Sequence, residues 1–250
     1  MNTNTLEKMS AMKLTGMARA FRSSLEMGRA QDLTSDEMIS QLVEAEWDER
    51  YNRKLERSVT RAHFRYKASV EQISYNPERT LDKNQVMRLA SCNFIKKKEN
   101  VIITGSTGIG KSYLASALGH QACSLGYKIM YLHSTKLFAK MKMAKADGSY
   151  LKELVKIEKQ DLILIDDFGI QPLDSASRTV LMEIIEDRHG KASTMITSQV
   201  PVNMWHEVIG EQTIADAILD RLVHDAHRVE MNGESMRKKK AINEEIDLNK

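Results

Sequence analysis

A glycine-rich stretch that ends in a lysine and a serine, Gly105 to Ser112, matches the pattern G-x-x-x-x-G-K-[ST]. A loop that wraps a polyphosphate must turn its backbone N–H groups inward, and glycines permit the φ angles that this requires. The helix that follows would direct its positive N-terminal dipole at the phosphates. The spacing therefore predicts a phosphate-binding loop in which Lys111 reaches the β- and γ-phosphates and the Ser112 hydroxyl binds Mg2+.

Every residue of this loop is predicted to contact the nucleotide: Gly105, Ser106, Thr107, Gly108, Ile109, Gly110, Lys111 and Ser112. The alternative is a chance match, which average residue usage would produce in about 1% of chains of this length. A strand-like apolar run before the loop and a helical pattern after it favour the phosphate-binding interpretation.

An apolar run that ends in two acids covers residues 161–167. Open parallel sheets bind ligands at the carboxyl ends of their strands, so Asp166 and Asp167 are expected beside the loop. Asp166 is predicted to hold Mg2+ through water, because this ion keeps most of its hydration. Asp167 is predicted to orient or deprotonate the attacking water. A strand that merely meets a turn gives the same pattern, and the preceding loop is what makes it a site.

Two later residues are candidates for the same chemistry. Gln199 follows the strand-like stretch 194–198 and is predicted to contact the γ-phosphate or the water; alternatively, it caps the helix that Pro201 begins. Arg221 lies on a predicted helix and would enter a neighbouring subunit's site as an arginine finger. Its alternative is a surface ion pair with Asp220 or Asp225.

Strand and helix patterns alternate after residue 99, which predicts an α/β fold with a parallel sheet covered on both faces. The strands are expected at 101–104, 128–133, 162–165 and 194–197. The helices are expected at 110–125, 135–145, 151–158, 174–188, 201–208 and 213–226.

The part of the chain before Pro77 has helical periodicity instead. Thr34 and Glu37 form a capping-box pattern ahead of a long helix. The expected apolar stripe of that helix is Trp47, Tyr51, Leu55, Val59, Ala62 and Tyr66. We therefore predict a helical N-terminal domain over 1–70, a linker and entry to the core over 71–98, an ATPase domain over 99–235 and a charged tail over 236–250.

Basic residues are concentrated in a chain of 250 residues whose formal net charge is only +3. Residues 50–67 hold seven Lys or Arg and one acid, Glu56. One predicted helix face carries Arg50, Lys54, Arg57, Arg61 and Arg65, and a second basic region includes Lys140 and Lys142. Both are predicted to bind duplex DNA through its phosphates with little sequence preference; the alternative for each is a solvated helix face.

The start of the chain has no secretory signal pattern, and no apolar run is long enough to span a bilayer. The two cysteines, Cys92 and Cys123, are expected to be free thiols in a reducing compartment. A cytoplasmic protein without membrane contact is the resulting expectation.

These motifs together resemble the AAA+ initiator and helicase-loader clade, which includes DnaA and DnaC. The resemblance rests on the loop, the L-I-D-D-F-G acids, the T-S-Q strand end and the D-R-L box. The N-terminal segments around Lys13–Ala18, Glu44–Arg57 and Ala62–Phe64 are more similar to the IstB family of insertion-sequence helper ATPases. The similarity covers roughly residues 6–240.

The resemblance implies a Mg2+-dependent ATPase with an AAA+ core, nucleotide-dependent self-assembly, DNA binding and a cognate transposase as partner. It assigns Lys111 and Ser112 to Walker A, Asp166 and Asp167 to Walker B, Gln199 to sensor 1 and Arg221 to the arginine finger. Generic AAA+ proteins have Glu where Asp167 stands. Too few residues follow Arg221 for a full C-terminal lid, since four average helices need roughly 45 residues.

Two other functions remain as alternatives. A helicase loader similar to DnaC would use the same core, with the N-terminal helices on a replicative helicase. A small-molecule P-loop kinase would leave the basic N-terminal helix without a role.

Overall fold

The computed structural model describes residues 2–28, 33–75 and 80–236. By their internal contacts, these residues form two compact units, 1–57 and 58–250. Helix α3, Ser35–Ala62, crosses the boundary between them. Pro77, within the predicted linker, and the tail after Met236 lie outside the described residues.

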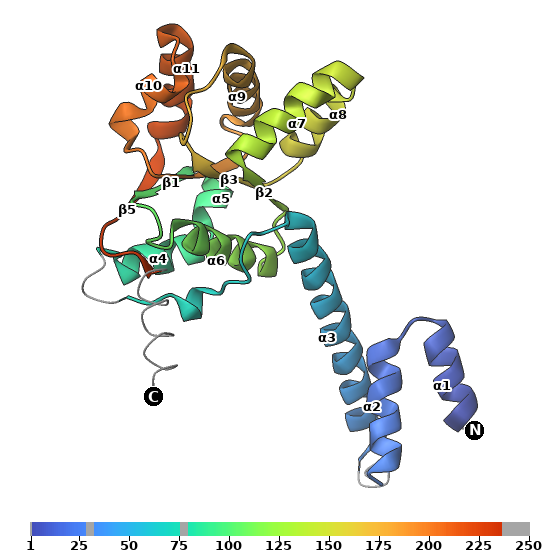
Figure 1. Cartoon of the computed structure of the whole chain (residues 1–250). Helices are drawn as coiled ribbons and strands as arrows, with labels where there is room; N and C mark the ends of the chain where they lie inside the picture. The colour runs from blue at the N-terminus through green and yellow to red at the C-terminus, as the bar shows by residue number, and fades with distance from the viewer. Residues whose placement is uncertain (1, 29–32, 76–79, 237–250) are drawn as a thin grey trace, which may run out of the picture. The chain divides into compact units, whose positions relative to one another are not determined.

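The first unit consists of helices (Figure 1): α1, Asn2–Ala11, α2, Thr15–Glu26, and most of α3. α2 approaches α3 closely at Gly16, where an added Cβ would stand 2.2 Å from the carbonyl oxygen of Ala45. Only glycine fits there. The capping box before α3 is confirmed, because the Glu37 carboxylate accepts the Thr34 N–H at 2.8 Å and the Thr34 hydroxyl accepts the Glu37 N–H at 3.3 Å.

The second unit is built on a five-stranded parallel sheet in the order β2-β3-β4-β1-β5. Its strands are β1 Asn100–Gly105, β2 Ile129–His133, β3 Leu162–Phe168, β4 Ser193–Ser198 and β5 Ala226–Met231. Because β4 lies between β1 and β3, the residues that end these three strands meet at one edge of the sheet.

Helices cover both faces of the sheet (Figure 1). One face carries α4 Lys83–Ala90 and α6 Lys111–Ser124, with α5 Asn93–Lys97 leading into β1. The other carries α7 Ser134–Asp147, α8 Tyr150–Glu158, α9 Ser175–Arg188, α10 Trp205–Ile209 and α11 Gln212–Val223. Two 3-10 turns complete the described elements, Val70–Gln72 and Val202–Met204. Strands buried on both faces are continuously apolar, as residues 162–165 are.

Four predictions need correction. The fifth strand was missed, and α11 ends at Val223, so the helix expected to reach residue 226 is too long. The apolar stripe on α3 is not a packed face throughout, because Trp47 is 73% exposed and Tyr51 48% exposed. The helix ends at Ala62, because His63 adopts a left-handed φ of 57°. Arg65 and Tyr66 are therefore not on α3.

Among the described residues, no helix has the length and apolar character needed to cross a membrane. Cys92 and Cys123 are both buried and free, and burial raises the pKa of each thiol to about 11.

Candidate functional site

The glycine-rich loop joins the end of β1 to the start of α6, as its pattern predicted. Gly108 and Gly110 have positive φ angles of 80° and 101°, which turn the backbone as a phosphate-binding loop requires. The Lys111 side chain is buried against this loop, and its Nζ donates to the carbonyl oxygens of Gly105 at 2.8 Å and Ser106 at 2.9 Å. The lysine charge is thus held at the loop's mouth.

Asp166 is fully buried at the end of β3, and its carboxylate accepts hydrogen bonds from three elements. Its Oδ1 accepts the Ser112 hydroxyl at 2.8 Å and the Thr197 hydroxyl. Its Oδ2 accepts the Tyr131 hydroxyl, and Nη1 of Arg65 lies 3.4 Å away. Burial raises the pKa of Asp166, but these hydrogen bonds and the Arg65 charge lower it by more, so the carboxyl stays ionised.

The donor set at Asp166 fits Mg2+. A serine hydroxyl and an ionised carboxylate are hard oxygen ligands, and this ion takes its remaining ligands from phosphates and water. Within the described chain, no three His, Cys, Asp or Glu residues cluster to hold a metal, so a site made by the protein alone has no support. Ser112 and Asp166 are therefore the residues that would hold the ion beside a bound triphosphate.

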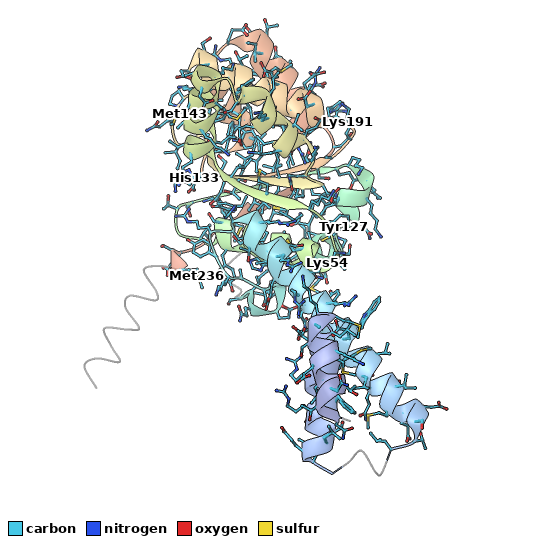
Figure 2. The ribbon with its side chains drawn as sticks, turned by 90° about the vertical axis from the view of Figure 1, so that its right-hand side faces the viewer. Lys54, Tyr127, His133, Met143, Lys191 and Met236 are labelled. Atoms are coloured by element: carbon cyan, nitrogen blue, oxygen red, sulfur yellow. The ribbon has the colours of Figure 1, made fainter. Side chains whose placement is uncertain are left out.

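Asp167 has a backbone that only a constrained site retains. Its φ of 59° is in the left-handed region, which is unfavourable for a residue with a Cβ. Its N–H donates to the Thr197 hydroxyl at 3.1 Å, and its Oδ2 lies 2.9 Å from Nη1 of Arg65. Nε2 of His133 is 3.5 Å from the same oxygen, at the end of β2 (Figure 2).

Four residues at the acids were not predicted for the nucleotide site: Arg65, which was predicted to bind DNA, and Tyr131, His133 and Thr197. Thr197 lies within the T-S-Q strand end, and its hydroxyl donates to the Asp166 carboxylate and accepts the Asp167 N–H. The order of the strands would therefore have indicated Thr197 as a site residue. Tyr131 and His133 end a neighbouring strand, and the parallel register of His133 with Asp166 brings them there. No comparable pattern indicates that Arg65 reaches the acids.

Gln199 lies at the phosphate loop. Its Oε1 accepts the Thr107 hydroxyl at 2.5 Å. The helical turn after Pro201 has no side-chain cap, so capping of that turn is not the role of Gln199. The neighbouring Ser198 instead stabilises the chain after β4, because its hydroxyl donates to the Phe168 carbonyl and accepts the Val200 N–H.

Arg221 lies at the amino ends of the strands, whereas the loop lies at their carboxyl ends. The side-chain amide of Asn100, which begins β1, donates to the Arg221 carbonyl at 3.0 Å, whereas the loop follows the end of β1. The Arg221 guanidinium pairs with Glu186 at 2.7 Å, not with Asp220 or Asp225. Arg221 is thus too far around the sheet to reach its own subunit's acids.

A cavity of about 470 Å3 opens above the loop. It is lined by Arg65, Tyr66, Gln72, Ile73, Ser74, Thr107, Gly108, Gly110, Lys111, Ser112, Tyr113, Leu114, Asp167, Gln199 and Met236. The lining combines the loop and Asp167 with aromatic and apolar residues such as Tyr66 and Tyr113. This composition suits a ligand with an anionic end and a flat, less polar end.

The predicted DNA-binding residues lie in different surroundings. Lys54, Arg57 and Arg61 are exposed on α3, and Arg50 pairs with Glu46 at 2.8 Å while its side chain stays 61% exposed. Lys140 and Lys142 on α7 pair with Glu153 and Asp174. The prediction that Arg65 lies on the basic helix face is wrong, because the residue lies beyond α3 and its guanidinium contacts the two acids.

The family model described as IstB-like ATP binding protein matches residues 7–244. The chain belongs to this IstB-like family. It is 44% identical over 234 residues to an insertion sequence ATP-binding protein of Sinorhizobium fredii, covering 94% of this chain and 96% of that protein. A similar protein of Pseudomonas fluorescens is 37% identical over 202 residues, which cover 80% of this chain and 87% of that protein. The loop and acids of this IstB-like chain thus lie in a family named for binding ATP.

Solved structures with the same fold belong to AAA+ proteins. The crystal structure of DnaI superposes with a TM-score of 0.58 at 22% identity, covering 66% of this chain and 91% of that one. The DnaC helicase loader superposes with a TM-score of 0.54 at 18% identity, covering 66% of this chain and 97% of that one. A DnaA replication initiator bound to AMPPCP and single-stranded DNA superposes with a TM-score of 0.58 at 17% identity, covering 74% of this chain and 56% of that one. At these identities the likeness establishes the AAA+ fold of the IstB-like chain and nothing finer.

Proposed function

We propose that this IstB-like protein is a Mg2+-dependent ATPase that assembles on duplex DNA and regulates the transposase of an insertion sequence. The observation that carries the ATPase part is the joining of Ser112, Asp166, Thr197 and Asp167 at one edge of the sheet, beside Lys111. The names of its relatives support the insertion-sequence part.

The residues divide the chemistry between them. The loop and Lys111 bind the phosphates and neutralise their charge, while Thr107 and Gln199 border the same pocket. Mg2+, when bound, supplies charge neutralisation at the β- and γ-phosphates. Asp167 orients a water for in-line attack on the γ-phosphorus and accepts its proton, and the bond to the leaving oxygen of ADP breaks as the bond to water forms.

Self-assembly is proposed because Arg221, the predicted arginine finger, lies away from the phosphate loop of its own subunit. Arg221 sits at the sheet edge opposite its own loop, where it can face a neighbour's triphosphate. A cation supplied across a junction stabilises the charge of phosphoryl transfer. Hydrolysis would then depend on assembly, and release of phosphate would weaken the junction.

DNA binding is supported by the basic face of α3. Within the described residues, Lys54, Arg57 and Arg61 form no ion pair, and all three are exposed at helical spacing. Such a face can neutralise phosphates without reading bases. The transposase follows from the relatives' insertion sequences. A helicase loader is the second candidate, supported only by the fold shared with DnaI and DnaC.

The test of the ATPase part measures nucleotide binding and turnover with and without duplex DNA. Lys111→Ala should lose tight ATP binding, because the loop would lose its only side-chain cation. Retained micromolar affinity in Lys111→Ala would contradict the phosphate role of the loop.

The DNA part is tested separately with the double variant Arg57→Glu/Arg61→Glu. Reversing both charges should weaken binding at every sequence tested and flatten its dependence on salt, with Lys191→Glu on the exposed surface as control. An unchanged salt slope would make α3 a solvated face. A pull-down of tagged protein against the transposase and the replicative helicase separates the two candidate partners.

A further inference from the structure

Arg65 belongs to none of the motifs, yet its guanidinium contacts both acids of the site. It lies three residues beyond the end of α3, and its Nη1 is 2.9 Å from Oδ2 of Asp167 and 3.4 Å from Oδ2 of Asp166. Its side chain is 36% exposed and lines the cavity above the loop. A cation of this chain thus occupies the side of the acids where a nucleotide and its metal would approach.

The residues on either side of Arg65 are held against α6. The Phe64 ring lies 4.4 Å from the His120 ring, and an added Cβ on Gly119 would stand 2.4 Å from the Phe64 ring. The Tyr66 and Tyr113 rings are 6.2 Å apart. Because these contacts fix the backbone near the cavity, the long side chain of Arg65 is the part that can change position.

A magnesium ion at Ser112 and Asp166 would compete with this guanidinium. Oδ1 of Asp166 already accepts two hydroxyl groups, and Oδ2 faces Tyr131 and Arg65. A divalent ion beside this carboxylate satisfies its charge and repels a nearby cation. The longer contact, to Asp166, is the weaker of the two, while the 2.9 Å pair with Asp167 has normal strength for a charge-assisted hydrogen bond.

We propose that Arg65 is a positioning residue of the ATPase site: its guanidinium holds both acids before metal binds, then gives up Asp166 to the ion and keeps Asp167 oriented. This inference rests on the proposed ATPase function. It explains how Asp167 is maintained at a φ of 59°, since the ion pair with Arg65 and the hydrogen bond with Thr197 restrain it from two sides.

The role has two opposite consequences for Arg65→Gln. Loss of the competing cation should tighten metal binding, whereas loss of the Asp167 partner should slow turnover. If Arg65 only stabilised the fold, its replacement would weaken both metal binding and turnover. Arg65→Lys keeps a charge but lacks the planar guanidinium whose Nη1 lies near both acids, so it should shift both quantities in the same directions by less.

The test titrates Mn2+ into the full chain with a non-hydrolysable ATP analogue, followed by electron paramagnetic resonance, and measures kcat and KM with Mg2+ in parallel. Arg65→Gln should lower the Kd for Mn2+ by about three- to tenfold and lower kcat by about tenfold or more. Lys67→Ala, exposed two residues away, is the matched control and should change neither.

An unchanged or raised Kd for Mn2+ in both Arg65 variants would overturn the proposal, as would an unchanged kcat. The lysine variant keeps the test informative if the glutamine variant does not fold. Wild-type protein that binds neither the analogue nor Mn2+ would instead refute the ATPase function itself.

Discussion

The Ser112 hydroxyl donates to the Asp166 carboxylate across 2.8 Å, although the two residues are 54 positions apart in the chain. This contact connects the first turn of α6 to the end of β3 and so joins the phosphate loop to the acid pair. A magnesium ion bound by both would replace a hydrogen bond that already fixes their spacing. The protein therefore holds the oxygens proposed to bind the metal in place through its own contacts.

Thr197 is the residue that ties the two acids together, and its replacement tests whether their geometry matters. Thr197→Val keeps the shape of the buried side chain but leaves Asp166 without one donor and the Asp167 N–H without its acceptor. We expect kcat to fall by about tenfold or more with a smaller change in ATP affinity. Steady-state kinetics and nucleotide titrations check this.

Thr179→Val, at an exposed position of α9, is the control for the loss of a threonine hydroxyl. Equal kcat values for wild type and Thr197→Val would remove Thr197 from the mechanism. A loss of stability of about 1–3 kcal/mol is also expected, because the part-buried Asp167 N–H and the buried Asp166 carboxylate each lose a partner.

Asp167→Asn should separate ATP binding from hydrolysis. The amide keeps the size of the side chain but cannot accept the proton of the attacking water, so turnover should fall by about 100-fold while ATP still binds. The stalled protein should remain assembled on DNA with ATP, which electron microscopy and sedimentation can detect. Normal turnover in this variant would assign the water to another group, with His133 as the nearest candidate.

Arg221→Ala should leave nucleotide binding by the single subunit intact and abolish the hydrolysis that depends on assembly. Removal of an arginine finger lowers kcat on the order of 1,000-fold. Lys191→Ala, also outside the nucleotide cavity, is the control. Full activity of Arg221→Ala in DNA-bound assemblies would show that the arginine serves only its pair with Glu186.

Mixing inactive variants tests whether Arg221 acts across a junction. In a mixture of equal amounts of Arg221→Ala and Asp167→Asn subunits, about a quarter of the junctions combine an intact acid with an intact arginine. Activity should therefore reappear on mixing. No recovery, with mixed assemblies demonstrated by differential tagging, would place Arg221 and Asp167 in the same subunit's site.

How well each part of the site could be predicted depended on how far apart in the chain its contacting residues lie. The loop was predictable because its glycines, lysine and serine are consecutive and do their work locally. The acid pair was predictable because an apolar strand delivers it to the ligand-binding edge. Arg65 was misplaced because helical periodicity runs on to Tyr66, while the left-handed φ of His63 ends the helix first. No periodic pattern reports a single residue that leaves the helix.

The edge strand β5 was missed for a related reason. Only Val229 and Met231 of its residues are buried, and the others are intermediate or exposed and include charged side chains. Such a short strand has no continuous apolar run, and the helical pattern of α11 extends into it. Its existence depends on pairing with β1, which is a tertiary contact that local sequence does not encode.

Glu46 gives the helical unit a buried charge with a structural role. Its Oε2 accepts the N–H groups of Gly16 and Met17 at 2.8 and 3.2 Å, at the start of α2, and its Oε1 pairs with Arg50. Burial raises the pKa of Glu46, but these partners lower it by more, so the folded value lies below the ordinary 4.5. The stabilisation is therefore complete above about pH 4.5 and lost as pH falls through the lower, folded pKa.

Glu46→Gln should therefore destabilise the packing of α2 on α3 by about 1–3 kcal/mol at pH 7, because the amide removes the charge that satisfies two N–H groups and a guanidinium. Amide hydrogen exchange of α2 in the full chain measures this, with Glu44→Gln on the exposed side of α3 as control. The difference from wild type should shrink in acid, since the wild-type carboxyl then protonates. A difference that stayed constant down to pH 3 would mean that charge contributes nothing and that Glu46 acts by shape alone.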